Sequence, residues 1–136
     1  MPPLNHAVLS ASSAYRWLEC PPSALATADI PDETTIYAQE GSAAHEMAEY
    51  KIRWHLGEKD LAPPNIGNFN AEEIDRYTDS YAYYVTDKIE TIRKTCPNAI
   101  VMVEQRLDFS NYVKDGFGTG DLVIVADDVL QVIDFK

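Results

Sequence analysis

Residues 118–136 read GTGDLVIVADDVLQVIDFK, and this stretch decides the fold. Two apolar runs rich in β-branched residues flank the pair Asp127-Asp128, which is the pattern of two strands joined by a short turn. If these two aspartates form a two-residue hairpin turn, Ala126 pairs with Val129 and every pair further out is set. The sequence therefore predicts an antiparallel hairpin in one register.

In that register Asp121 lies directly across from Asp134. Directly opposed residues have Cβ atoms about 4.5–5.5 Å apart, and like charges placed so are destabilising. A divalent cation between them would offset the repulsion, and carboxylate oxygens suit Mg²⁺ or Mn²⁺. Lys136 follows Asp134 by two residues, so a strand would present both side chains on one face. The ordinary alternative is a surface hairpin with a polar outer face.

The rest of the chain changes from helical to strand-like periodicity after Pro97. Apolar spacing and the N-cap residues Ser10 and Asn70 predict helices over residues 11–19, from about 35 or 40 to 56, and 71–96. Strands are expected over residues 100–109, 122–125 and 129–135. The predicted fold class is α/β (α+β), with N-terminal helices followed by an antiparallel three-stranded meander. We expect one domain, helical over 1–97 and sheet over 98–136.

The amino-acid composition argues against two classes of protein: those that attract nucleic acid over a broad charged surface and those that span a membrane. The 136 residues include 22 Asp and Glu against 11 Lys and Arg, a net charge of −11, which argues against broad electrostatic attraction to nucleic acid. Hydrophobic residues make up 46% of the chain, enough for a core, yet no apolar run approaches the roughly 20 residues of a membrane span. We expect a soluble, cytoplasmic protein that does not associate with membranes.

Four short motifs occur in an order that resembles the PD-(D/E)XK nuclease superfamily. Within it the chain is most similar to the RecB-like branch, and more narrowly to a group of phage and prophage proteins. The motifs span nearly the whole chain: LSAS at 9–12 with WLECP at 17–21, EGxxxH ending at His45, Gly120-Asp121, and IDFK at 133–136.

The resemblance implies a Mg²⁺- or Mn²⁺-dependent deoxyribonuclease, an exonuclease of phage recombination or repair, with DNA as its partner. It implies a metal site made by His45, Asp121 and Asp134 with the backbone carbonyl of Phe135. Asp121 and Asp134 would be catalytic together with Lys136, which would act near the attacking water. Without this context, a lone helical histidine is ordinarily packed or exposed.

Three features bear on these expectations. Gly41 precedes His45 by one helical turn, where a glycine permits close backbone approach. Glu104, in the first predicted strand, is a candidate extra acidic ligand, although a solvated strand residue is the ordinary interpretation. Cys20 sits where some RecB-like nucleases begin an iron–sulfur cluster, but four thiolates are needed and the chain has two cysteines. No cluster is expected, and a buried structural thiol is the alternative for Cys20.

The sequence ends at Lys136, whereas relatives continue with another strand and a helix bearing a Gln-x-x-x-Tyr motif. We therefore expect an incomplete nuclease-like domain, the N-terminal fragment of a longer protein. The alternative function is a non-catalytic fragment or interaction module that keeps the nuclease-like fold. Such a module would form a homo-oligomer through the exposed edge of its sheet.

Overall fold

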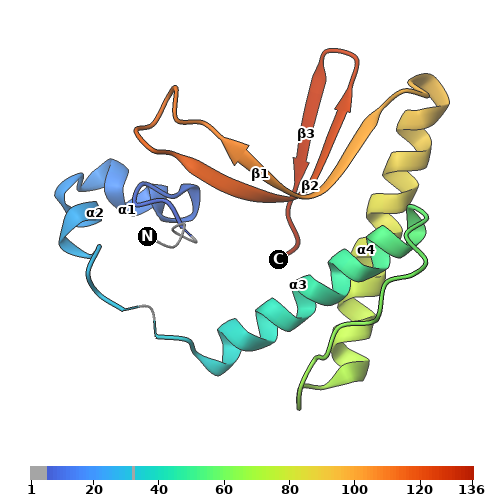
Figure 1. Ribbon diagram of the computed structural model, residues 1–136, viewed down its shortest axis with the longest axis horizontal. Coiled ribbons are helices and arrows are strands. Elements are labelled where there is room, and N and C mark those ends of the chain that lie inside the picture. Colours follow the sequence, from blue (N-terminus) through green and yellow to red (C-terminus); the bar gives the residue numbers. More distant parts are fainter. Residues whose placement is uncertain (1–5, 32) are drawn as a thin grey trace. The chain divides into compact units, whose positions relative to one another are not determined.

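The computed structural model describes residues 6–31 and 33–136 (Figure 1). Short helical elements come first, two long helices follow, and three strands form one sheet in the order β1-β2-β3, which confirms the predicted α+β class. The elements are η1 (Ala11–Ser13), α1 (Ala14–Glu19), α2 (Pro22–Ala26), α3 (Ile36–His55), α4 (Ala71–Thr95), β1 (Ile100–Asp108), β2 (Phe117–Ala126) and β3 (Val129–Ile133). None of the described helices combines the length and hydrophobicity that a membrane crossing requires.

The chain divides into two compact units, which are described separately. The described residues up to Glu33 form one unit together with Arg106–Gly120, and Thr34–Gln105 forms the other together with Asp121–Lys136. Strands β1 and β2 each contribute to both units.

The N-terminal unit differs in detail from the single helix predicted over residues 11–19. The chain begins there as a 3₁₀ turn, and the Ser10 side chain caps no backbone N–H. Instead the Ser10 and Ser13 hydroxyls share a 2.7 Å hydrogen bond, and the Trp17 indole N–H donates to the Ser10 carbonyl at 2.9 Å. Cys20 is exposed, which overturns the expectation of a buried thiol, and α2 starts two residues later.

Helices α3 and α4 begin and end at residues that the sequence singles out. The Thr35 hydroxyl accepts the backbone N–H of Ala38 at 3.1 Å, and the Asn70 side chain accepts that of Glu73 at 3.2 Å. Each bond satisfies a backbone donor that has no partner within its helix. Gly57 follows α3 with φ of +111°, a conformation that favours glycine.

The core of the second unit lies between these two helices and β2. Its fully buried members are Ile52 of α3, Val85 and Ile89 of α4, and Leu122 and Ile124 of β2, none more than 3% exposed. Helices α3 and α4 lie against each other in Figure 1, and both contribute side chains to this cluster. Burial of each such side chain is worth roughly 1.5–3 kcal/mol, so this cluster fixes the helices against the sheet.

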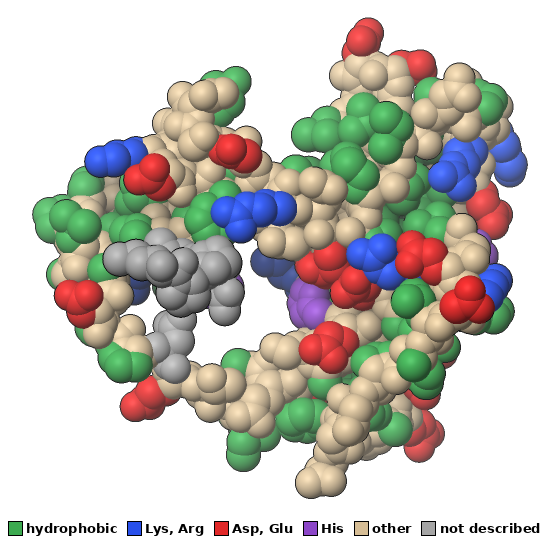
Figure 2. All heavy atoms as spheres, viewed as in Figure 1, with side chains coloured by type: hydrophobic (Ala, Val, Ile, Leu, Met, Phe, Trp, Pro, Cys, Tyr) green, Lys and Arg blue, Asp and Glu red, His purple; other side chains and the backbone are tan. Residues whose placement is uncertain are grey.

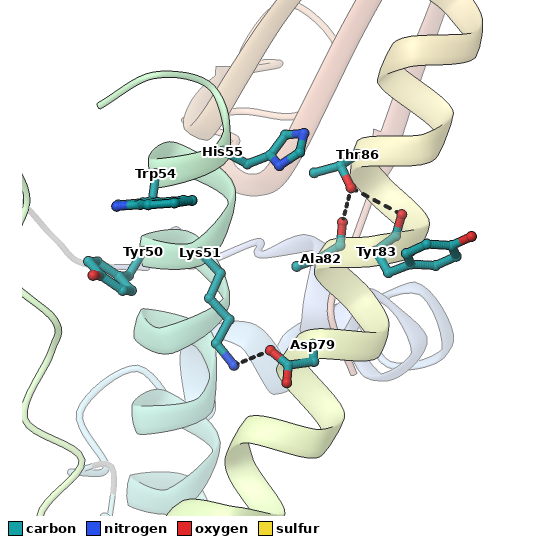
Figure 3. A pocket seen from close by; sticks show the side chains of 8 residues that line it. All are labelled: Tyr50, Lys51, Trp54, His55, Asp79, Ala82, Tyr83 and Thr86. Atoms are coloured by element: carbon teal, nitrogen blue, oxygen red, sulfur yellow. Dashed lines mark hydrogen bonds and ion pairs between the residues drawn. The ribbon is translucent and has the colours of Figure 1, made fainter. Parts of the chain in front are cut away.

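A second, polar connection joins α3 to α4. The Lys51 ammonium lies 2.9 Å from Asp75 Oδ1, 2.6 Å from Asp79 Oδ1 and 2.8 Å from the Thr78 hydroxyl. Figure 3 shows Lys51 reaching from α3 towards Asp79 in the groove between the helices. Lys51 therefore anchors the two helices to each other without contributing to the sheet.

The β2–β3 hairpin has the predicted register. Ala126 pairs with Val129 and the ladder continues to Leu122 and Ile133. Strand β2 begins at Phe117, earlier than predicted, and β3 ends at Ile133 rather than residue 135. The ladder therefore ends one pair before the position at which this register would place Asp121 opposite Asp134.

Candidate metal centre

Three side chains of the second unit converge at one place: His45 from α3, Glu104 from β1 and Asp121 from β2. One ligand atom from each lies within 4.8 Å of the other two. Figure 2 shows acidic side chains gathered beside a histidine side chain on the viewed face. One imidazole and two carboxylates form a donor set that fits a divalent cation such as Mn²⁺ or Mg²⁺.

Helix α3 presents His45 with its ring orientation set by Phe135. The two rings meet edge to face, with centroids 5.2 Å apart and an interplanar angle of 77°. The His45 side chain is 40% exposed, so solvent and a small ion can reach it. A Cβ built on Gly41 would meet nothing within 4 Å, so the expected close backbone approach at that glycine is not present.

Asp121 is held from two sides at a single oxygen. Its Oδ2 accepts the backbone N–H of Phe135 at 2.7 Å and lies 3.4 Å from Nδ1 of His45. The Asp121 side chain is 18% exposed, which makes it more enclosed than the imidazole beside it. The carboxylate therefore has a defined direction before any ion arrives.

Glu104 joins the group through an unusual backbone conformation. Its φ is +50°, in the left-handed region that residues with a Cβ seldom adopt in a strand. Burial raises the pKa of its carboxyl, and the negative charges of Asp121 and Glu49 raise it further. A cation at this place would offset that repulsion. Glu104 thus lies in the same cluster as His45 and Asp121.

The last residues of the chain pack against both long helices. The centroid of the Phe135 ring lies 5.0 Å from that of Tyr81 on α4, in addition to its contact with His45. The Tyr81 hydroxyl donates to the Ile133 carbonyl at 3.5 Å. Burial raises the pKa of the Tyr81 phenol well above its usual range, and the nearby carboxylates Asp121, Asp134 and Glu104 add to the effect.

The structure brings together His45, Asp121 and the extra candidate Glu104, but it leaves Asp134 and Lys136 outside this group. Both of the latter are exposed and follow the end of β3. The predicted face-to-face pairing of Asp134 with Asp121 is absent, because the Phe135 N–H donates to the Asp121 side chain instead of extending the ladder.

Sequence reasoning missed Arg53, which links α3 to β1 beside Glu104. Its Nε lies 2.7 Å from Glu49 Oε1, and its Nη2 donates to the Val103 carbonyl at 3.2 Å. The spacing of four residues between Glu49 and Arg53 is a detectable helix-face signal. The contact with β1 has no sequence signature, since it joins distant parts of the chain.

Comparison with known proteins identifies the family. No solved structure gives a significant match to this chain. Residues 6–136 match the family described as "Protein of unknown function (DUF2800)". The match includes all three residues of the candidate metal centre and both long helices. The chain therefore belongs to the DUF2800 family.

Proposed function

We propose that this chain carries the metal centre of a DNA nuclease of the PD-(D/E)XK, RecB-like kind. The observation that carries the proposal is the convergence of His45, Glu104 and Asp121 within 4.8 Å. His45, Glu104 and Asp121 would hold a divalent cation, which would lower the pKa of a bound water and polarise the phosphodiester. An exonuclease acting in phage recombination or repair is the role that the resemblance to RecB-like nucleases implies.

The residues around the cluster have separable roles in this proposal. Asp121 and Glu104 supply carboxylate oxygen ligands, and His45 supplies an imidazole nitrogen. Phe135 orients two of the three ligands, one through its backbone N–H and one through its ring. Lys136 follows Phe135 directly, and we assign its ammonium to the attacking water and the developing charge on the phosphate. Asp134 is a further carboxylate on the same terminal segment.

The acidic surface has a direct consequence for how DNA is bound. The two carboxylates of the cluster repel a phosphate group unless a cation lies between them and the substrate. The net charge of −11 adds a long-range repulsion that salt screens. Cleavage should therefore require Mn²⁺ or Mg²⁺ absolutely, with metal and substrate binding coupled.

The test is cleavage of end-labelled linear DNA in Mn²⁺, in Mg²⁺ and in EDTA. Asp121→Asn should lower the rate at least about 100-fold, because loss of a ligand exceeds the effect of outer-shell changes. Asp128→Asn is the matched control, since Asp128 lies in the β2–β3 turn and outside the cluster. Cleavage in EDTA, or equal rates for Asp121→Asn and the wild type, would refute the nuclease proposal.

A second candidate function is self-association through β3. This strand is at the end of the sheet order, and Val129, Leu130 and Val132 are 55%, 61% and 48% exposed. Unpaired backbone groups flanked by exposed apolar side chains favour strand addition by another chain. Light scattering at increasing protein concentration in EDTA tests this, with Val132→Lys expected to abolish the dimer. A monomer at every concentration would exclude this candidate.

A further inference from the structure

Glu104, the third member of the candidate metal centre, has a left-handed backbone. Its φ of +50° is unfavourable for any residue with a Cβ. Such conformations persist when the surrounding structure holds them, and they concentrate at functional sites. The neighbouring residue Val103 packs against the core. The Glu104 carboxylate lies with His45 and Asp121.

The Arg53 guanidinium contacts the peptide that immediately precedes Glu104. Its Nη2 donates to the carbonyl oxygen of Val103 at 3.2 Å. Two carboxylates fix the guanidinium: Glu49 lies 2.7 Å from Nε, and Glu58 lies 3.3 Å from Nη1. Because the guanidinium is planar and rigid, these two bonds determine where the third donor points.

One face of α3 carries both His45, a candidate metal ligand, and Arg53, which contacts β1. His45, Glu49 and Arg53 are spaced by four residues, so their side chains follow one another along the same face. The helix that supplies His45 thus also holds β1 at the point where the chain turns Glu104 towards the cluster. Lys51, on the same helix, makes its contacts with α4 instead.

We propose that Arg53 is a positioning residue for the metal centre. Through the Val103 carbonyl it holds the left-handed turn at Glu104, so that this carboxylate stays beside His45 and Asp121. The inference rests on the proposed function, since it concerns the geometry of the same site. The competing explanation is that Arg53 only stabilises the fold. The two explanations predict different coupling between Arg53 and Glu104 in their effects on Mn²⁺ affinity.

The experiment is a double-variant cycle on Mn²⁺ affinity, measured by titration calorimetry on the full chain. Arg53→Met should weaken Mn²⁺ binding about tenfold, the lower end of outer-shell effects on metal sites. Because Arg53 acts through Glu104, adding Arg53→Met to Glu104→Gln should cause no further loss. Lys51→Met is the matched control: it removes a comparable anchor from α3 and should leave Mn²⁺ affinity unchanged.

Each outcome has one interpretation. If the wild type binds no Mn²⁺, the proposed function fails and the inference fails with it. Two results would refute only the positioning role. In one, Arg53→Met binds Mn²⁺ as tightly as the wild type does. In the other, the loss of affinity caused by Arg53→Met adds fully to the loss caused by Glu104→Gln. If circular dichroism shows Arg53→Met unfolded, Arg53→Lys replaces it in the cycle. A lysine ammonium cannot reproduce the fixed donors of the arginine guanidinium. Arg53→Lys is therefore also expected to weaken Mn²⁺ binding, without adding to the loss caused by Glu104→Gln.

Discussion

The backbone N–H of Phe135 donates to Oδ2 of Asp121 at 2.7 Å, where a continued hairpin would have placed a ladder bond. This bond ends β3 and turns the terminal segment onto the helices. The Phe135 ring contacts both His45 and Tyr81, with ring centroids 5.2 and 5.0 Å away. Phe135 thus links the end of the sheet to both long helices and to two residues of the candidate metal centre.

Removing the Phe135 ring should destabilise the protein and loosen the site. We expect Phe135→Ala to lower the free energy of unfolding by about 1–3 kcal/mol, less than the ~3–5 typical of a fully buried phenylalanine. Guanidinium unfolding in EDTA measures this. Tyr81→Phe is the companion variant: its lost hydroxyl makes only a 3.5 Å bond, so a change under about 1 kcal/mol is expected. A larger loss for Tyr81→Phe than for Phe135→Ala would contradict this ordering.

The raised pKa of Glu104 predicts a pH dependence of metal-free stability. The folded protein binds the Glu104 proton more tightly than the unfolded chain, so stability falls as pH rises through the carboxyl range. Glu104→Gln removes this loss. In EDTA its Tm should exceed that of the wild type at neutral pH, and the difference should vanish below the ordinary carboxyl pKa of 4.5. Differential scanning calorimetry across pH measures this, and a pH-independent difference would be contrary to the expectation.

The left-handed backbone at position 104 predicts an unusual preference for glycine within a strand. In EDTA, Glu104→Gly should be more stable than Glu104→Ala by about 0.5–1 kcal/mol, because the left-handed cost for alanine exceeds the extra chain entropy of glycine. Urea unfolding compares the two. The same pair of substitutions at Met102, whose φ is not positive, should show the opposite order. Alanine being the more stable variant at both positions would show that φ at Glu104 is not left-handed.

Much of the fold follows from local patterns. Apolar spacing in α4, the cap Asn70 and the Asp127-Asp128 turn are short-range signals, and all correspond to observed elements. The short α2 was missed because its Pro-rich start resembles a loop. Residues at the ends of elements depend on tertiary contacts, which explains why β3 stops at Ile133.

The candidate site was only partly predictable. His45 and Asp121 belong to motifs with characteristic spacing, so the sequence singles them out. Glu104 has a left-handed backbone within a strand, and Arg53 contacts a carbonyl that is distant in the sequence. Neither feature is a pattern along the chain. Asp134 was expected across from Asp121 by extending an ideal ladder, which the Phe135 contact interrupts.

The most direct test of the metal centre is calorimetric titration of the chain with Mn²⁺, compared with Asp121→Asn and the Asp128→Asn control. We predict one-site binding in the wild type and in Asp128→Asn, and at least about a 100-fold loss in Asp121→Asn, since a direct ligand is removed. Equal binding by all three proteins, or binding by none, would contradict a metal centre at His45, Glu104 and Asp121.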